Sequence, residues 1–284
     1  MSDNKQVIIR ELPTGVLTND HFEMTTTPMP TPMEGQLLVR VILMSIDAAN
    51  RAWMQGATYR EAVKAGDVMH TYAIGQVVTA NADGFNEGDM VAVEAGWTEF
   101  CAVDASKAKK LPAMRPLSHL LSAFGIAGKT AYHGLVDVGR PLSGETVVVS
   151  AAAGSVGMFV GQIAKALGCR AVGIAGGAEK CAWVVDTLGF DACVDYQSPG
   201  LFKALRSACP DGIDIYFDNV GGPVLETTLF QMNMKGRVVC CGAVSQYNES
   251  SPTGPRNLPG LVVVKRLRME GFIVMDFADQ GAKA

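Results

Sequence analysis

The sequence is poor in charge and in aromatic side chains, and it holds no cluster of basic residues. Charged residues make up 18% and aromatic residues 7% of the 284 residues, and the net charge at pH 7 is −4. The nearest approach to a basic patch is Lys107, Lys109 and Lys110, too few to attract a nucleic-acid backbone. We therefore expect no nucleic-acid partner. With 48% hydrophobic residues, the chain is predicted to be globular.

The sequence also lacks a disulfide framework and a zinc-ligand set. Its 7 cysteines are odd in number and contain no C-x-x-C pair; Cys240 and Cys241 alone are adjacent. This use of cysteine is typical of reduced, buried thiols in the cytoplasm. The N-terminal half offers Cys101 and the histidines His21, His70 and His119, without the spacing that zinc ligands need. We expect no metal.

Signals for export or membrane insertion are missing as well. The N-terminal residues MSDNKQ do not have the charged-then-apolar layout of a signal peptide. The longest uncharged run, residues 146–164, approaches the length of a membrane span. Its glycines and its strand-turn-helix pattern instead predict a buried βα unit, so we expect a cytoplasmic protein with no membrane partner.

The two parts of the chain differ in their pattern. Residues 1–120 contain short apolar runs separated by Gly, Pro and Asp, which predicts a small β-barrel. Residues 117–139 have a helical pattern. After Gly144, strands near residues 146, 170, 192, 212 and 237 alternate with helices, which predicts a doubly wound parallel sheet. We expect an α/β protein with domains at 1–120 and 121–284.

The most informative segment is TVVVSAAAGSVG, residues 146–157. A β-branched run ends in a small-residue turn, and a helical pattern follows from about Val156 to Leu167. Gly154 and Gly157 take the second and third places of G-x-G-x-x-G, while Ala152 takes the first. Such a turn lets a pyrophosphate approach the backbone at a helix N-terminus, so the segment predicts dinucleotide binding.

The end of the next strand bears on which dinucleotide is bound. NAD sites usually place an acid about 20 residues past the glycines, where it accepts from the ribose 2′-OH. Here the strand ends in Gly176-Gly177, and Lys180 follows. This favours NADP, because Lys180 can pair with a 2′-phosphate. Two alternatives stay open: Lys180 is a solvated helix residue, or Glu179 serves as a displaced acid.

Several motifs together resemble the zinc-independent prostaglandin reductase and double-bond (curcumin-type) reductase branch of the medium-chain dehydrogenase/reductase superfamily. They include GKTAYHGL (128–135), AAAGSVG (151–157), GGAEK (176–180), YFDNVGG (216–222), CGAVSQYN (241–248) and RMEGFIV (268–274). The resemblance implies a GroES-like β-barrel domain followed by a Rossmann domain. It also implies an enzyme, expected to be a homodimer, that reduces the C=C bond of apolar enals and enones with NADPH.

The resemblance also implies roles for particular residues. It places the cofactor on Thr130, Gly154, Ser155, Val156, Gly157, Met158, Lys180, Tyr196, Asn219, Cys241, Gly242, Ala243, Val244, Ser245, Phe272, Ile273 and Val274. Tyr247 is the candidate catalytic donor to the substrate carbonyl, with a loop anchor as the alternative. Arg51 matches a substrate-side arginine and is equally suited to an internal salt bridge.

Several residues depart from the pattern of the family. Ala48, Ala49, Asn50, His70 and Tyr72 differ from the residues common in the family, mostly on the substrate side. Family members continue past the position of Asp279 and return to the first domain. This sequence lacks that return segment, and we expect either a truncated product or a shortened protein. The alternatives are therefore an NADPH-dependent quinone oxidoreductase and a cofactor-binding homologue with weak catalysis.

Overall fold

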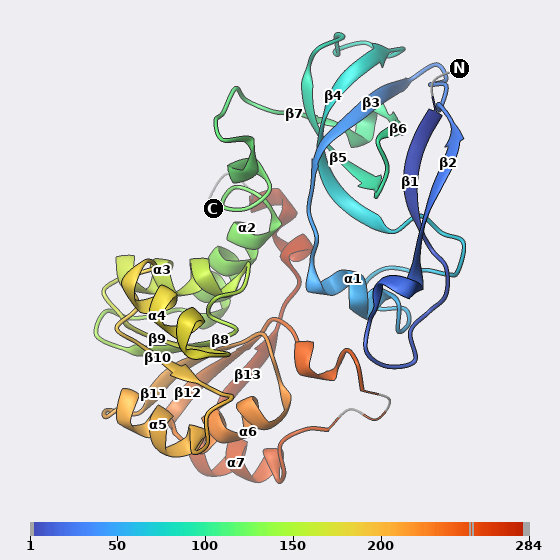
Figure 1. Cartoon of the computed structure of the whole chain (residues 1–284). Coiled ribbons are helices and arrows are strands. Elements are labelled where there is room, and N and C mark those ends of the chain that lie inside the picture. The colour runs from blue at the N-terminus through green and yellow to red at the C-terminus, as the bar shows by residue number, and fades with distance from the viewer. Residues whose placement is uncertain (1–2, 250, 252, 281–284) are drawn as a thin grey trace. The chain divides into compact units, whose positions relative to one another are not determined.

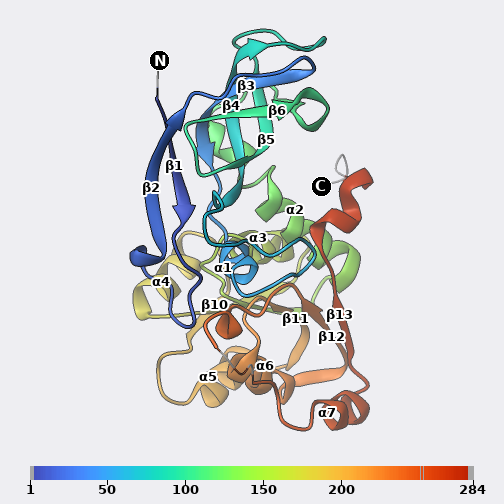
Figure 2. The same ribbon diagram turned by 90° about the vertical axis from the view of Figure 1, so that its right-hand side faces the viewer.

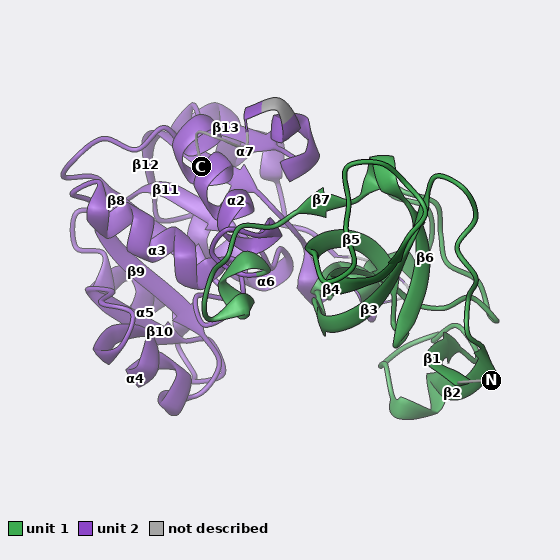
Figure 3. Cartoon of the chain, turned by 90° about the horizontal axis from the view of Figure 1, so that it is seen from above, with its two compact units in different colours: residues 1–121 green, residues 122–284 purple. Residues whose placement is uncertain are grey.

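The computed structural model describes residues 3–249, 251 and 253–280. The chain divides into two compact units, residues 1–121 and 122–284 (Figure 3). The first unit is built of β-strands and the second alternates strands with helices, which confirms the predicted fold class. No helix in the described part of the chain combines the length and the apolar character that crossing a membrane requires.

The first unit contains a five-stranded antiparallel sheet in the order β6-β3-β4-β5-β7 (Figure 1). Its strands are β3 (Gln36–Met44), β4 (His70–Ala80), β5 (Met90–Gly96), β6 (Phe100–Asp104) and β7 (Lys109–Lys110). Alternate side chains of β3, β4 and β5 form an apolar core that includes Leu37, Val39, Val77 and Val91. This alternation is what a sheet with one buried face requires.

A hairpin that the sequence analysis missed lies beside this sheet (Figure 2). Strand β1 (Asp3–Ile9) pairs antiparallel with β2 (Phe22–Pro28). Ile9, the last residue of β1, is fully buried in a small cluster with Trp53, Met54 and Met69. Trp53 belongs to the short helix α1 (Ala48–Trp53), so the hairpin and α1 share one apolar cluster.

The second unit contains a six-stranded parallel sheet in the order β10-β9-β8-β11-β12-β13. Its strands are β8 (Thr146–Ser150), β9 (Arg170–Ala175), β10 (Ala192–Asp195), β11 (Ile213–Asp218), β12 (Met232–Cys240) and β13 (Arg268–Gly271). All five residues of β8 are buried, as expected for a central strand covered on both faces. The sixth strand, β13, was not predicted.

Helices cover both faces of this sheet (Figure 1). One core lies under α2 (Ile126–Tyr132), α3 (Gly157–Ala166) and α4 (Ala178–Asp186), with Leu135, Val160 and Val184 as members. The other lies under α5 (Leu201–Ala208), α6 (Gly222–Leu229) and α7 (Leu258–Lys265), with Leu205, Leu225 and Leu229 as members. The predicted helix over 117–139 is instead a 3-10 turn (Leu117–Leu120), then α2, then the π-helical turn η4 (His133–Gly139).

Candidate active site

The carboxyl end of the parallel sheet gathers most of the predicted site residues. Because β8, β9, β11, β12 and β13 run parallel, the segments that follow them leave from the same edge. In open α/β sheets, ligands bind outside this edge. Thr130 on α2 is the predicted cofactor residue that does not follow a strand.

The turn after β8 has the geometry of a phosphate-binding turn. Ala151 takes a left-handed conformation with φ 50°, which is uncommon for a residue with a side chain. A Cβ atom on Gly154 would lie 3.0 Å from the Ala151 carbonyl oxygen, and one on Gly157 would collide with that oxygen. The turn itself therefore requires glycine at position 157, before any ligand is considered, whereas a side chain at position 154 would make a tight contact with the Ala151 carbonyl.

Three backbone donors at the start of α3 have no backbone partner in the described part of the chain. Among the described residues, the N–H groups of Ser155, Val156 and Gly157 have no backbone acceptor, whereas Met158 donates to the Gly154 carbonyl at 3.1 Å. Three free N–H groups at a helix N-terminus are suited to an anion such as a pyrophosphate. The Val156 side chain packs against the core, so this residue offers its backbone to a ligand.

The ends of β9 and β10 hold the predicted 2′-phosphate residues. Lys180 is exposed in the first turn of α4, and Tyr196 follows β10 with 49% of its surface exposed. Glu179 beside Lys180 is also exposed. The sequence analysis missed Asp195, whose Oδ1 accepts from the Gly177 N–H at 2.8 Å at the tip of β9. Asp195 lies on the neighbouring strand, 18 residues away from Gly177, so the sequence alone does not show that the two residues meet.

A buried carboxylate organises the turn after β11. Asp218 is 3% exposed, and its Oδ1 accepts from the Tyr216 hydroxyl at 2.8 Å and the Gly221 N–H at 2.9 Å. Loss of hydration on burial raises the pKa of Asp218 above 3.8, against the opposing effect of these hydrogen bonds. Asn219 is held beside it, because its Nδ2 donates to the Ser150 carbonyl at 2.8 Å. Asp218 was not predicted as a site residue, although it lies within the YFDNVGG motif.

The loop after β12 is joined to this turn by backbone bonds. Cys241 and Gly242 both donate to the Asp218 carbonyl, and Val244 donates to the Asn219 carbonyl at 3.1 Å. Ser245 Oγ donates to the Val220 carbonyl at 2.6 Å, while Ala243 lies 3.4 Å from the Cβ position of Gly221. The predicted residues 241–245 are thus brought together with Asn219.

Tyr247 reaches back over the same loop. Its hydroxyl oxygen lies 3.5 Å from the position that a Cβ atom on Gly242 would occupy. The hydroxyl is therefore placed at the carboxyl end of β12, within van der Waals range of that position. Burial raises the pKa of the neighbouring Cys241 thiol to about 12, so Cys241 is neutral at pH 7.

The segment after β13 is held from its inner side. The Phe272 ring packs against Phe217 and fills the space over Gly134, where a Cβ atom would collide with it. Phe277, in the turn η6 (Val274–Gln280), stacks on the buried His133 ring at 4.6 Å. His133 Nδ1 lies 2.7 Å from Asp137 Oδ2 in the π-helical turn. These contacts fix the positions of Ile273 and of Val274, the first residue of η6, at the sheet edge.

Arg51 lies in the first unit and is bonded within it. The side chain belongs to α1 and is 8% exposed, and its Nη2 donates to the Gly15 carbonyl at 2.8 Å. Burial lowers the pKa of Arg51. This bond joins α1 to the loop that contains Gly15, so Arg51 stabilises the first unit.

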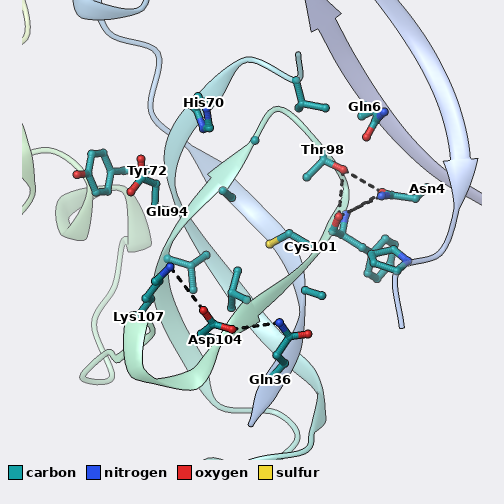
Figure 4. A pocket seen from close by; sticks show the side chains of 18 of the residues that line it. Asn4, Gln6, Gln36, His70, Tyr72, Glu94, Thr98, Cys101, Asp104 and Lys107 are labelled. Carbon is teal, nitrogen blue, oxygen red and sulfur yellow. Dashed lines mark hydrogen bonds and ion pairs between the residues drawn. The ribbon is translucent and has the colours of Figure 1, made fainter. Parts of the chain in front are cut away.

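The first unit has a cavity of its own, of about 960 Å³, which none of the predicted site residues lines. Its wall includes His70, Tyr72, Glu94 and Cys101 (Figure 4). Burial raises the pKa of Cys101 to about 11, and burial together with Glu94 raises the pKa of Tyr72. Both groups are thus neutral at pH 7, and the wall offers no thiolate or phenolate nucleophile.

Comparisons with known proteins bear on the site. The family model described as the N-terminal domain of oxidoreductase matches residues 5–111, and the one described as zinc-binding dehydrogenase matches residues 155–282. The chain is 40% identical to the NADPH-dependent curcumin reductase of Escherichia coli, over 95% of this chain and 80% of that protein. It is 42% identical to prostaglandin reductase 1 of Rattus norvegicus, over 92% of this chain and 78% of that protein. The chain belongs to the medium-chain dehydrogenase/reductase superfamily.

Within this superfamily, the chain falls in the branch of the prostaglandin and curcumin reductases. The crystal structure of CurA from Vibrio vulnificus in complex with NADPH superimposes with a TM-score of 0.93 at 38% identity, covering 98% of this chain and 85% of that one. Although one family model is described as zinc-binding, residues 3–249, 251 and 253–280 contain no group of three or more His, Cys, Asp or Glu placed to hold a metal ion.

Proposed function

We propose that this protein reduces the C=C bond of α,β-unsaturated aldehydes and ketones with NADPH. The observation that carries the proposal is the likeness to the curcumin and prostaglandin reductases over nearly the whole chain. The proposed site is the carboxyl edge of the second unit's sheet, and the substrate is a small apolar molecule.

The residues at this edge fit a dinucleotide. The free N–H groups of Ser155, Val156 and Gly157 would hold the pyrophosphate, and Gly154 leaves the approach clear of a side chain. Lys180 and Tyr196 would contact the 2′-phosphate, and Thr130, Asn219, residues 241–245 and residues 272–274 would line the rest of the cofactor. When bound, NADPH supplies a hydride to the β-carbon of the substrate.

Tyr247 is the proposed catalytic residue. As the C=C bond is reduced, negative charge develops on the carbonyl oxygen, and a hydroxyl donor stabilises the resulting enolate. The Tyr247 hydroxyl lies over Gly242, at the edge where the substrate carbonyl is expected. The loop that carries it is bonded to the Asp218 turn, so the donor is held before substrate arrives. The α-carbon then takes its proton from solvent.

Arg51 remains on the substrate side in this proposal, where its bond to the Gly15 carbonyl favours a positioning role over direct contact with substrate.

We also propose a cytoplasmic homodimer. The absence of paired cysteines supports the reducing compartment: all seven cysteines, including Cys169 and Cys209, are free. Light scattering tests the assembly, with twice the 30.0 kDa chain mass as the expected result.

An anaerobic turnover panel tests the function. NADPH oxidation is followed with an enal, an enone and a quinone, and cofactor binding is measured separately by quenching of tryptophan fluorescence. We expect turnover of the enal or enone with NADPH. Turnover of the quinone alone would replace the proposal by a quinone oxidoreductase, and binding without turnover would identify a catalytically weak homologue.

A further inference from the structure

The two residues that follow β9, which form its tip, are glycines and carry no side chains. Gly176 follows the last residue of the strand, and Gly177, with φ 89°, precedes the first turn of α4. In NAD-binding relatives of this fold, an acid at this place accepts a hydrogen bond from the ribose 2′-OH. What occupies the space instead decides which cofactor the tip can accept.

Two side chains from the next strand's turn fill this space. A Cβ atom on Gly176 would lie 3.0 Å from a ring carbon of Tyr196 and 3.1 Å from the Nε2 atom of Gln197. The Gln197 Oε1 atom lies 3.9 Å from the corresponding position on Gly177. Both Tyr196 and Gln197 are also exposed, so each presents one side to a ligand. An acid at position 176 would have to displace them.

Asp195 holds this arrangement. Its Oδ1 accepts from the Gly177 N–H at 2.8 Å and from the Gln197 N–H at 2.9 Å, and its Oδ2 accepts from the Ser198 hydroxyl at 3.0 Å. One carboxylate therefore ties the turn after β10 to the tip of β9. The Gly177 bond, and after it the Gln197 bond, lower the pKa of Asp195 below 3.8, so these bonds are intact at neutral pH.

The charge of Asp195 is already engaged by the chain. Three donors converge on its two oxygens, and two of them are backbone N–H groups that a bound nucleotide cannot replace. The carboxylate is thus less available to a ribose hydroxyl than a free acid would be. The exposed amide of Gln197 beside it carries two N–H donors and no charge, which suits a phosphate oxygen.

We propose that Gln197 is a specificity-determining residue whose amide donates to the 2′-phosphate of NADPH, with Asp195 as the residue that positions it. This inference rests on the proposed NADPH-dependent function. Lys180 supplies the positive charge at this place, and Gln197 supplies a directed neutral donor over Gly176. The pair distinguishes NADPH from NADH by attraction at the phosphate, with no side chain at position 176 to favour the 2′-OH.

The test is the substitution Gln197→Glu, which keeps the size of the side chain and converts the amide into an anion. Dissociation constants of NADPH and NADH are measured by tryptophan fluorescence or calorimetry, without substrate. We expect the NADPH constant to rise at least about 10-fold and the NADH constant to stay level or fall. Gln231→Glu is the control, because Gln231 precedes β12 and so lies at the amino ends of the strands, away from the carboxyl edge, and it should leave both constants unchanged.

A second pair of variants tests the positioning role. Asp195→Ala should reduce the preference for NADPH, whereas Asp195→Asn should largely retain it, because the amide oxygen still accepts from Gly177 and Gln197. Thermal unfolding of each variant checks that the fold is intact. If Asp195→Ala keeps the full preference while folded, the positioning role is wrong.

The outcomes separate this inference from the function on which it rests. A parental protein that prefers NADPH, with a smaller preference after Gln197→Glu, supports the inference. The same parental preference, unaltered by Gln197→Glu, overturns the role of Gln197 and leaves the proposed function standing. A parental protein that binds NADPH and NADH equally overturns the inference together with the proposed choice of cofactor.

Discussion

Lys180 and Tyr247 are held in different ways by the fold. Lys180 is exposed on the first turn of α4, where a ligand can reach it. Tyr247 is half-buried, on a loop that the Asp218 turn fixes through backbone bonds. A substitution at Lys180 should therefore act on binding, and one at Tyr247 on the chemical step.

For Lys180→Ala, we expect weaker NADPH binding and little change for NADH. A charge-assisted contact of this kind contributes about 1.5–3 kcal/mol, or roughly 10- to 100-fold in the dissociation constant. Fluorescence titration with both cofactors measures it, and Lys203→Ala, an exposed lysine on α5, is the control. Equal weakening for NADPH and NADH would contradict the assignment.

For Tyr247→Phe, we expect a lower kcat with an enone while the NADPH dissociation constant stays near the parental value. Removal of one preorganised donor costs about 10²–10³ in kcat, and less where water substitutes, so we expect the lower end. Tyr59→Phe, an exposed tyrosine of the first unit, provides a control. Parental turnover by Tyr247→Phe would show that Tyr247 is a loop anchor.

For Asp218, the raised pKa makes a prediction about stability. Between pH 3.8 and the raised value, the folded protein binds more protons at this group than the unfolded chain, so its contribution to the free energy of unfolding falls as the pH rises. Asp218→Asn removes this contribution and keeps an acceptor for the Gly221 N–H. The melting temperature of the variant relative to the parent should therefore be higher at pH 7 than at pH 4. A difference that is constant or reversed across this range would contradict the account.

At the scale of elements, the turn from β8 to α3 combines cofactor binding with packing. Gly157 lies where a Cβ would collide with the Ala151 carbonyl, and Gly161 lies against the Phe190 ring, where any side chain would also collide. The G-x-x-G spacing predicted the turn correctly. It could not show that Gly161 serves the packing of α3 on Phe190, because Phe190 lies 29 residues further along the chain.

Gly157→Ala should test how far the turn tolerates a side chain. Overpacking of this kind typically costs about 1–3 kcal/mol, and here it also displaces the N–H groups at the start of α3. We expect a lower melting temperature and weaker binding of NADPH and NADH alike. Gly254→Ala, where no atom lies within 4 Å of the added Cβ, should change neither. Unchanged binding by Gly157→Ala would remove the turn from the cofactor site.

The elements that the sequence did not predict share a cause. Strand β13 is the short, partly exposed segment RMEG, which has no apolar run and is recognised as a strand only by its pairing with β12. The hairpin β1–β2 has twelve residues between its strands and no tight-turn signal. Asp195 was missed for the same reason, since its partner Gly177 lies on the neighbouring strand's loop. Alternating patterns identify what is buried along the chain, while pairing between distant segments leaves little trace in one sequence.

At the scale of the whole molecule, the sequence patterns predicted the β-rich first unit and the doubly wound second unit, and the motifs predicted the superfamily. The second unit on its own collects the proposed cofactor residues, from the turn after β8 to the segment after β13. The first unit contains Arg51 and the cavity beside Cys101. The two units together are proposed to reduce a C=C bond with NADPH.

Transfer of deuterium tests this claim most directly. The protein is incubated with an enone and NADPH labelled at the nicotinamide C4 position, and the product is analysed by NMR and mass spectrometry. The account predicts a saturated ketone that carries the deuterium on its β-carbon. Deuterium on the carbonyl carbon of an allylic alcohol, or an unlabelled and unreduced enone, would contradict it.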